Sequence, residues 1–473
     1  MTLSRRTLLA AAAGSLGALA AGCSTRPASD PMTRGMPAAG QGSAADDVTG
    51  PYDPRRAEGT AIHALFINNT YSQVLREDLA AFTALTGIEV RTTLLPEEEY
   101  FDRVTIALVS GLPDVDVFMT GAYRVWQYGP PGWMEDLDPW LANPSATGED
   151  YDLDDLLPHL QDALRWDFTL GEPVGGGGRW ALPWWWESNV LAYRADVFDR
   201  LGLHPPATFA ELEDTARVTD AHMKVEQPGE GYGLAVRGSL SWATVQAGFM
   251  TQFTREGGRD FTIRGGHLAP AVDSPVSVDF HRRWAAMVRE AGPRRWSEYN
   301  YQNCTYDLGS GRAAMMYDAT SVGLPLDAPR ASAAAGLLAW SPGPAGPDGD
   351  LSSNLWVSSL AMSSRSQQKM AAWLFLQWAT GKKHARFAAL RNCADPVRHS
   401  VLADGAYRDA LSVHRGYLET QDAVRDTTRI TFTPQPYFFD ATTAWAGALQ
   451  DMVGGADVPG ALAALADRMR RRA

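Results

Sequence analysis

The sequence predicts an α/β fold with doubly wound sheets flanked by helices. From about Thr60 onward, short apolar runs alternate with longer segments whose apolar residues recur at helical spacing. Strands that alternate with helices form parallel sheets, and right-handed crossovers place the helices on both faces. The chain has 473 residues, more than one core usually fills, so we expect two domains.

The first sheet is predicted from five elements in the order strand, helix, strand, helix, strand. They are a strand over 61–67, a helix that ends at Thr86, a strand over 88–95, a helix over 96–108 and a strand over 115–119. In such sheets ligands bind at the carboxyl ends of the strands, where loops carry the polar groups. Asn69 and Tyr123 lie on two of these strand-end loops, so we predict that both contact a ligand.

A second set of elements follows four consecutive glycines, 175–178. These glycines do not predict a phosphate-binding loop, because no Lys-Ser or Lys-Thr pair follows them, and we interpret them as a turn. The later elements are strands over 190–193, 232–237, 313–317 and 354–362, with helices around 197–201, 209–218, 370–380 and 442–472 and another that opens at 239–242. Asp318 follows the third of these strands and Trp242 begins a helix, so both are candidate ligand contacts.

The N-terminus predicts export. Arg5-Arg6 precede an apolar run over 8–21 that is too short to span a bilayer and is followed by small residues. The arginine pair resembles a twin-arginine signal, and the residues before Cys23 resemble a lipobox. We therefore expect residues 1–22 to be a signal peptide, Cys23 to carry lipid in a membrane, and 23–59 to form a flexible tether. Whether the general or the twin-arginine pathway exports the chain stays open.

The composition excludes several classes of function. A formal charge of −13 argues against nucleic acid as a partner, since phosphate binding needs clustered Lys and Arg. The nine His are scattered and no C-x-x-C occurs, so we expect no metal and no cofactor. Two further cysteines, Cys304 and Cys393, can form a disulfide or remain separate buried thiols, and an oxidising compartment slightly favours the disulfide.

Six segments, in this order, carry a resemblance to a known family. They are FTALTGIEV at 82–90, SGLPDVDVFM at 110–119, ALPWWWESNVLAYRADVF at 181–198, PPATFAEL at 205–212, GSGRAAMMYD at 309–318 and AWLFLQWA at 372–379. Through them the chain resembles the sugar-type extracellular solute-binding proteins of ABC importers, the group that includes maltose-binding protein. The resemblance covers most of the chain after residue 60.

The resemblance implies a two-lobed periplasmic-binding-protein-like fold with three hinge crossings. Lobe I is then expected at 60–183 and 318–362, and lobe II at 184–317 and 363–473. A ligand would bind in the cleft and the lobes would close around it. The implied partners are a small carbohydrate or polyol and the permease subunits of an importer, and the protein is expected not to be an enzyme.

Residues 184–189, WWWESN, suit a sugar at the predicted crossing between lobes. A sugar has apolar CH faces, which stack on indole rings, and hydroxyls, which each need a polar partner. Alternate residues of an extended segment face opposite sides, so we expect one or two of the three Trp to reach the cleft. The resemblance adds Trp356, on the last crossing strand, and Arg398, on a late loop. The candidate ligand contacts are Asn69, Tyr123, Trp184, Trp185, Trp186, Glu187, Asn189, Trp242, Asp318, Trp356 and Arg398.

Two alternatives stay open. A glycoside-processing enzyme needs two opposed carboxylates, and Glu187 with Asp318 would supply them. A binder of another small solute, such as a polyamine or a peptide, is the second, because carboxylates in a cleft also suit a cation. The sequence names neither the sugar nor the permease.

Overall fold

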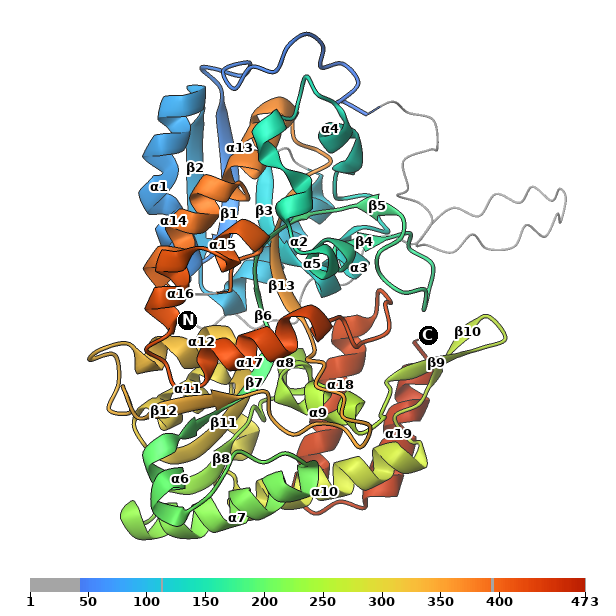
Figure 1. Cartoon of the computed structure of the whole chain (residues 1–473). Coiled ribbons are helices and arrows are strands. Elements are labelled where there is room, and N and C mark those ends of the chain that lie inside the picture. The colour runs from blue at the N-terminus through green and yellow to red at the C-terminus, as the bar shows by residue number, and fades with distance from the viewer. Residues whose placement is uncertain (1–42, 112–113, 393–394, 473) are drawn as a thin grey trace, which may run out of the picture.

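Two α/β lobes, each built on its own sheet, make up the molecule (Figure 1). The computed structural model describes residues 43–111, 114–392 and 395–472. The sheet of the first lobe has the strand order β2-β1-β3-β13-β6, and the sheet of the second has the order β12-β7-β11-β8. The predicted fold class, two lobes that each carry a sheet flanked by helices, is therefore confirmed.

The first lobe begins with β1, whose apolar residues pair in parallel with β2 and β3. Its strands are β1 (Ala61–Ile67), β2 (Glu89–Leu95), β3 (Val117–Gly121), β6 (Leu182–Glu187) and β13 (Trp356–Met362). Its main helices are α1 (Thr70–Thr86), α2 (Glu97–Ser110), α3 (Ala122–Tyr128), α13 (Lys369–Ala379) and α14 (Lys382–Asn392). The side chain of Asn69 accepts a hydrogen bond from the Ser72 amide and so caps α1, while Gly87, at a φ of 73°, ends that helix.

The second lobe is built around β11, which runs parallel to β8 and antiparallel to β7. Its strands are β7 (Asn189–Arg194), β8 (Tyr232–Ala235), β11 (Ala313–Ala319) and β12 (Leu338–Ser341), with a hairpin of β9 (Phe261–Arg264) and β10 (His267–Pro270). Its main helices are α6 (Ala195–Leu201), α7 (Phe209–Glu226), α8 (Trp242–Gln246), α9 (Gly248–Arg255), α10 (Pro275–Ala291), α11 (Tyr301–Gly309), α17 (Tyr417–Val424), α18 (Phe438–Val453) and α19 (Val458–Arg470).

Short elements connect these parts. They are the helices α4 (Asp138–Ala142), α5 (Pro158–Asp162), α12 (Thr320–Gly323), α15 (His399–Leu402) and α16 (Gly405–Leu411), the strands β4 (Arg165–Trp166) and β5 (Gly178–Arg179), and 3-10 turns at Glu149–Tyr151, Leu153–Asp155, Trp296–Glu298, Leu324–Asp327 and Arg425–Thr427. None of the helices among the described residues is long and apolar enough to cross a bilayer.

The division of the chain between the two lobes, as the strand pairing shows it, differs from the expected boundaries. Strand β12, expected in the first lobe, pairs antiparallel with β7 in the second. Helices α13 and α14, expected in the second lobe, lie beside α1 in the first (Figure 1). There the ring of Phe82 contacts the rings of Phe375 and Trp378, at centroid distances of 5.4 and 5.3 Å. These pairings join residues far apart in the sequence, so local patterns do not reveal them.

Residues 43–59 were expected to belong to the tether, but they lie against the first lobe. Ala45 is fully buried, and the side-chain amide of Asn143 donates hydrogen bonds to the carbonyls of Ala45 and Val48, at 2.7 and 2.8 Å. The amide of Gly59 also donates to the carbonyl of Gly87. Residues before the first strand thus form part of the first lobe. The expected signal peptide and the lipid site at Cys23 lie outside the described residues.

Candidate functional site

A cavity of about 340 Å³ lies between the two lobes, where several helices of both lobes begin. The first residue of α2, Glu97, lines it from the first lobe, and the first residues of α8 and α11, Trp242 and Tyr301, line it from the second. We call this cavity and the residues beside it the interlobe cleft. The cavity is lined by Glu97, Phe101, Asp102, Arg124, Arg237, Ser239, Ser241, Trp242, Ala243, Asn300, Tyr301 and Gln302.

Arg237 and Asp318 form a buried ion pair at the cleft. Arg237 Nη2 lies 2.5 Å from Asp318 Oδ1, and Nε lies 2.9 Å from Oδ2, so the guanidinium donates to both carboxylate oxygens. The Ala319 amide donates to Asp318 Oδ1 as well, at 2.7 Å. Asp318 therefore holds Arg237, and Arg237 is the member of the pair that lines the cavity.

Glu187 is the last residue of β6 and is 8% exposed. Burial raises the pKa of its carboxyl group to about 7, Asp318 and Asp395 raise it further, and the Ser321 hydrogen bond and Arg237 oppose the shift. The Ser321 hydroxyl donates to Glu187 Oε2. Near neutral pH this carboxyl group exists in both protonation states, so it can donate or accept a hydrogen bond.

Aromatic rings form one wall of the cleft. Trp242 is half-buried and packs on Trp356 with a ring-centroid distance of 5.2 Å, while Trp356 Nε1 donates to Ser358 Oγ at 3.0 Å. Behind them Tyr123 stacks on Phe438 at 4.2 Å and donates its hydroxyl hydrogen to the Leu355 carbonyl at 2.9 Å. Trp242 thus presents ring surface to the cavity, and the other rings hold it in place.

Arg124 joins the two lobes across the cleft. Its guanidinium carbon lies 4.3 Å from the ring centre of Phe101 in the first lobe and 3.7 Å from that of Phe439 in the second. Burial lowers the pKa of Arg124. Among the described residues its Nε has no hydrogen-bond partner. This cation–π contact thus links the two lobes.

The side chains of the three consecutive tryptophans do not simply alternate between the two faces of β6. In the pairing of β6 with β13, Ser358 lies opposite Trp185 and Ser359 opposite Pro183, so Trp184 is the extra residue of a β-bulge. Trp184 and Trp185 both contact the ring of Tyr71, at centroid distances of 6.3 and 4.1 Å. Trp186 contacts the His159 ring instead and donates its Nε1 hydrogen to the Pro396 carbonyl at 3.0 Å.

Three candidate contacts hydrogen-bond to their own chain, while Asn189 Oδ1 and Arg398 Nη2 have no partner among the described residues. Asn69 caps α1, as described above. Asn189, directly after Glu187 and Ser188 at the crossing between sheets, donates from Nδ2 to the Asn354 carbonyl at 3.0 Å. Arg398 donates to the carbonyls of Thr380 and Asp152, at 2.8 and 2.9 Å, and is fully buried. The structure brings Glu187, Trp242, Asp318 and Trp356 together at the cleft, and it places Arg398 in a separate network in the first lobe.

Several residues at the cleft were not singled out from the sequence. Arg237 ends the predicted strand over 232–237, so the rule that strand ends carry ligands would have found it. Arg124 follows the predicted contact Tyr123 directly. No sequence pattern pointed to Tyr71 or Ser321, because only the folded structure shows that they contact Trp185 and Glu187 of β6.

The expected disulfide is not described by the structure. Cys304 is fully buried in the second lobe, and Cys393 lies outside the described residues, so the pairing stays a prediction. No group of three or more metal-ligating side chains occurs within the described ranges.

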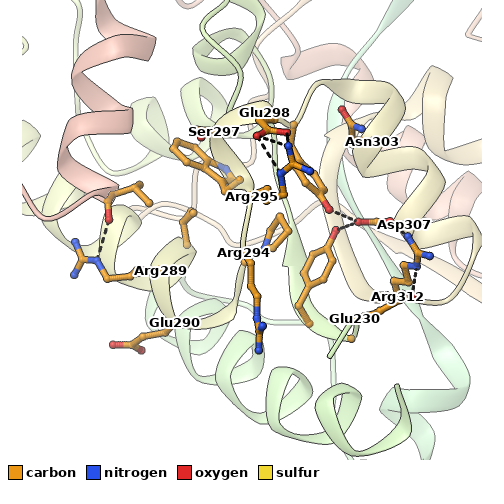
Figure 2. Close-up of a pocket in the computed structure, with 18 of the residues that line it drawn as sticks. Glu230, Arg289, Glu290, Arg294, Arg295, Ser297, Glu298, Asn303, Asp307 and Arg312 are labelled. Atoms are coloured by element: carbon orange, nitrogen blue, oxygen red, sulfur yellow. Dashed lines mark hydrogen bonds and ion pairs between the residues drawn. The ribbon is translucent and has the colours of Figure 1, made fainter. Parts of the chain in front are cut away.

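A larger hollow, of about 1260 Å³, lies on the second lobe between the ends of α7, α10 and α18. We call it the outer groove. Asp307 accepts hydrogen bonds from two tyrosines, Tyr232 and Tyr299, at 2.7 and 2.8 Å. Figure 2 marks these bonds as dashed lines at Asp307. Arg295 pairs with Glu298 at the rim. None of the candidate ligand contacts lines this groove.

A family model described as bacterial extracellular solute-binding protein matches residues 68–386. The erythritol/L-threitol-binding protein of Mycolicibacterium smegmatis is 47% identical over 425 residues, which cover 89% of this chain and 88% of the relative. The mannitol-binding protein of Pseudomonas aeruginosa is 27% identical over 363 residues, covering 74% of this chain and 76% of the relative.

Solved structures share the fold. An ABC transporter solute-binding protein from Agrobacterium radiobacter, in complex with ribitol, superposes with a TM-score of 0.74 at 22% identity. The match covers 90% of this chain and all of that one. At this identity the likeness establishes the two-lobed fold and does not establish the ligand.

Proposed function

Since this chain belongs to the bacterial extracellular solute-binding proteins, we propose that it captures a small polyol or sugar between its lobes and delivers it to the permease of an ABC importer. The lobes close around the ligand by hinge motion, as their connection through the strand crossings allows. The protein binds its ligand without changing it chemically.

The observation that carries this proposal is the composition of the interlobe cleft. A flat indole, Trp242, and the guanidinium of Arg237 both line the cavity, and the carboxyl group of Glu187 lies close enough to both Arg237 and Asp318 for its pKa to respond to them. The ring suits the CH face of a polyol, and the two polar groups suit its hydroxyls. Each buried hydroxyl needs such a partner, because an unpaired one costs about 1–3 kcal/mol.

The size of the cavity favours a small ligand. Its volume of about 340 Å³ lies near the lower end of ligand pockets, which span about 300–1,000 Å³ for drug-sized molecules. The relatives support the same choice, since the most similar of those described above binds erythritol and L-threitol and the second binds mannitol. A four- to six-carbon polyol is therefore the ligand that we propose first, with a monosaccharide second.

We also propose that the protein is exported and attached to the outer face of the membrane through lipid on Cys23. The charged and apolar segments before Cys23 support this proposal. Replacing Cys23 by Ser should release the protein from the membrane fraction, and metabolic labelling with a fatty acid should mark the parent and not the variant.

The glycosidase alternative needs a free second carboxylate, but both oxygens of Asp318 already accept hydrogen bonds, from Arg237 and from the Ala319 amide. Incubation with aryl glycosides tests it directly. Turnover that disappears in Glu187→Gln would establish an enzyme in place of a binder.

Isothermal titration calorimetry of the protein without its first 23 residues tests the main proposal. The probes are erythritol, L-threitol, ribitol, mannitol and glucose, with spermidine and a tripeptide as the charged alternatives. We expect saturable binding of at least one polyol with Kd near the micromolar range, about −8 kcal/mol. Binding of spermidine or the peptide with no binding of any polyol or sugar would overturn the proposal.

A further inference from the structure

A second, much smaller cavity lies beside the bulged part of β6. Its volume is about 20 Å³. It is lined by Tyr71 from the first turn of α1, by two tryptophans of β6, by α14 and by the segment that follows it. The lining residues are Tyr71, Trp184, Trp185, His384, Ala385, Ala388, Ala389, Asp395 and Pro396. We call it the bulge cavity.

Three of the residues that line the bulge cavity each carry a buried polar atom without a partner. They are Tyr71 Oη, Trp185 Nε1 and His384 Nε2, and none of them has a hydrogen bond among the described residues. Trp185 is 8% exposed and His384 is 1% exposed, so solvent does not satisfy them. A buried polar atom left unpaired costs about 1–3 kcal/mol, and three around one cavity indicate that a polar group belongs there.

The three atoms complement one another chemically. His384 Nδ1 lies 2.8 Å from Asp78 Oδ2, and a carboxylate only accepts, so Nδ1 carries a hydrogen, and in the Nδ1–H tautomer Nε2 is an acceptor. Trp185 Nε1 only donates, and the Tyr71 hydroxyl does both. The cavity thus offers a donor, an acceptor and a group that can be either, which is the set that a single hydroxyl group requires.

The size of the bulge cavity allows one such group. A water molecule needs about 10–15 Å³ of accessible volume and two to four polar partners, and the cavity has about 20 Å³ and three. The cavity also lies near Glu187, because burial, Asp395 and Glu187 together raise the pKa of Tyr71. Trp185 and Glu187 are two residues apart beyond the bulge, so their side chains lie on the same face of β6.

We propose that the bulge cavity is a binding site for one hydroxyl group, held by Tyr71, Trp185 and His384. Two sources supply that chemistry: a terminal hydroxyl of the ligand that lies in the cleft, or a fixed water molecule. The first source rests on the proposed function and the second does not. With the ligand as source, these three residues determine specificity, because they require a terminal hydroxyl within reach of Glu187.

Crystal structures of the protein with and without erythritol test this proposal, together with the variants Tyr71→Phe and Trp185→Phe. Both variants remove a hydrogen-bonding group and keep the ring stack between Tyr71 and Trp185. The matched control is Tyr306→Phe, since Tyr306 is 62% exposed on the second lobe. The binding constant for erythritol and the Tm are measured for each variant.

Density in the bulge cavity that appears only with erythritol, with Kd raised about tenfold in Tyr71→Phe, supports the ligand as source. Density in both crystals, with Kd unchanged and Tm lowered relative to Tyr306→Phe, supports a water molecule. An empty cavity in both crystals, with Tyr71→Phe and Trp185→Phe equal to the parent in Kd and Tm, overturns the proposal. If no polyol binds at all, the proposed function fails, and the crystal without ligand still decides whether the site holds a hydroxyl.

Discussion

The interlobe cleft and the outer groove both combine aromatic rings with charged groups, yet they are built differently. The groove is the larger, about 1260 Å³ against about 340 Å³, but every residue that lines it belongs to the second lobe. Its ion pair of Arg295 with Glu298 is exposed. The cleft draws residues from both lobes, and its ion pair of Arg237 with Asp318 is buried.

This difference shows why volume does not locate the functional site. A hollow within one lobe keeps its shape when the lobes move, whereas a hollow between lobes changes with their closure. Burial also makes charges and hydrogen-bonding groups in the cleft interact more strongly than those in the groove. We therefore expect substitutions in the cleft to change stability and ligand binding, and equivalent substitutions in the groove to change neither.

The largest effect is expected from the buried ion pair. Asp318→Ala leaves the Arg237 guanidinium buried without its partner, which should lower the free energy of unfolding by about 3–5 kcal/mol. Urea unfolding measures it. Arg295→Ala, the matched change in the groove, should be indistinguishable from the parent. In the double variant Arg237→Met with Asp318→Leu, most of the loss should be recovered, and a double variant as unstable as Asp318→Ala would contradict this account.

The second effect concerns pH. The pKa of Glu187 is about 7 in the folded protein and near 4.5 when unfolded, so between these values the unfolded chain releases a proton that the folded chain keeps. The contribution of Glu187 to the free energy of unfolding should thus be fully present below pH 4.5 and be lost as the pH rises through 7, by at most about 3 kcal/mol. Glu187→Gln should remove this loss.

Unfolding by urea at pH 5 and pH 7.5 measures the effect for the parent and the variant. Glu298→Gln in the groove serves as the control and should keep the pH dependence of the parent. An equal fall in the parent and in Glu187→Gln would show that Glu187 titrates normally.

The third effect is on ligand binding. Trp242→Ala removes the ring surface that lines the cleft, and Kd for the bound polyol should rise about tenfold, or 1.4 kcal/mol. Leu240→Ala is the control, because Leu240 is 63% exposed and lies two residues away. Calorimetry that finds Trp242→Ala and Leu240→Ala equally tight would place the ligand elsewhere.

The smallest effect is expected in the outer groove itself. Arg294 lines the groove and is exposed, so Arg294→Ala should leave Kd for the polyol within twofold of the parent. A loss of binding in this variant, measured by the same titration, would reverse the comparison and make the groove the ligand site.

Sequence patterns predicted the individual elements well and the contacts between them poorly. The strands at 61–67 and 313–317 and the helix over 370–380 were expected within a few residues of β1, β11 and α13, because periodicity is a local property. The bulge at Trp184 was not expected, since it depends on the register with β13. Without it, Trp184 and Trp185 would face opposite sides and could not both contact Tyr71.

The sequence by itself determined the α/β class, the order of the elements and the family, because apolar spacing and short motifs are read along the chain. Only the tertiary structure decided that Asp318 binds Arg237, 81 positions away, that residues 43–59 pack on the first lobe, and that α13 and α14 belong to it. The physical reason is that burial and pairing arise between segments that are distant in the sequence. The sequence shows a carboxylate at Asp318, but only the folded structure shows that a guanidinium already binds it.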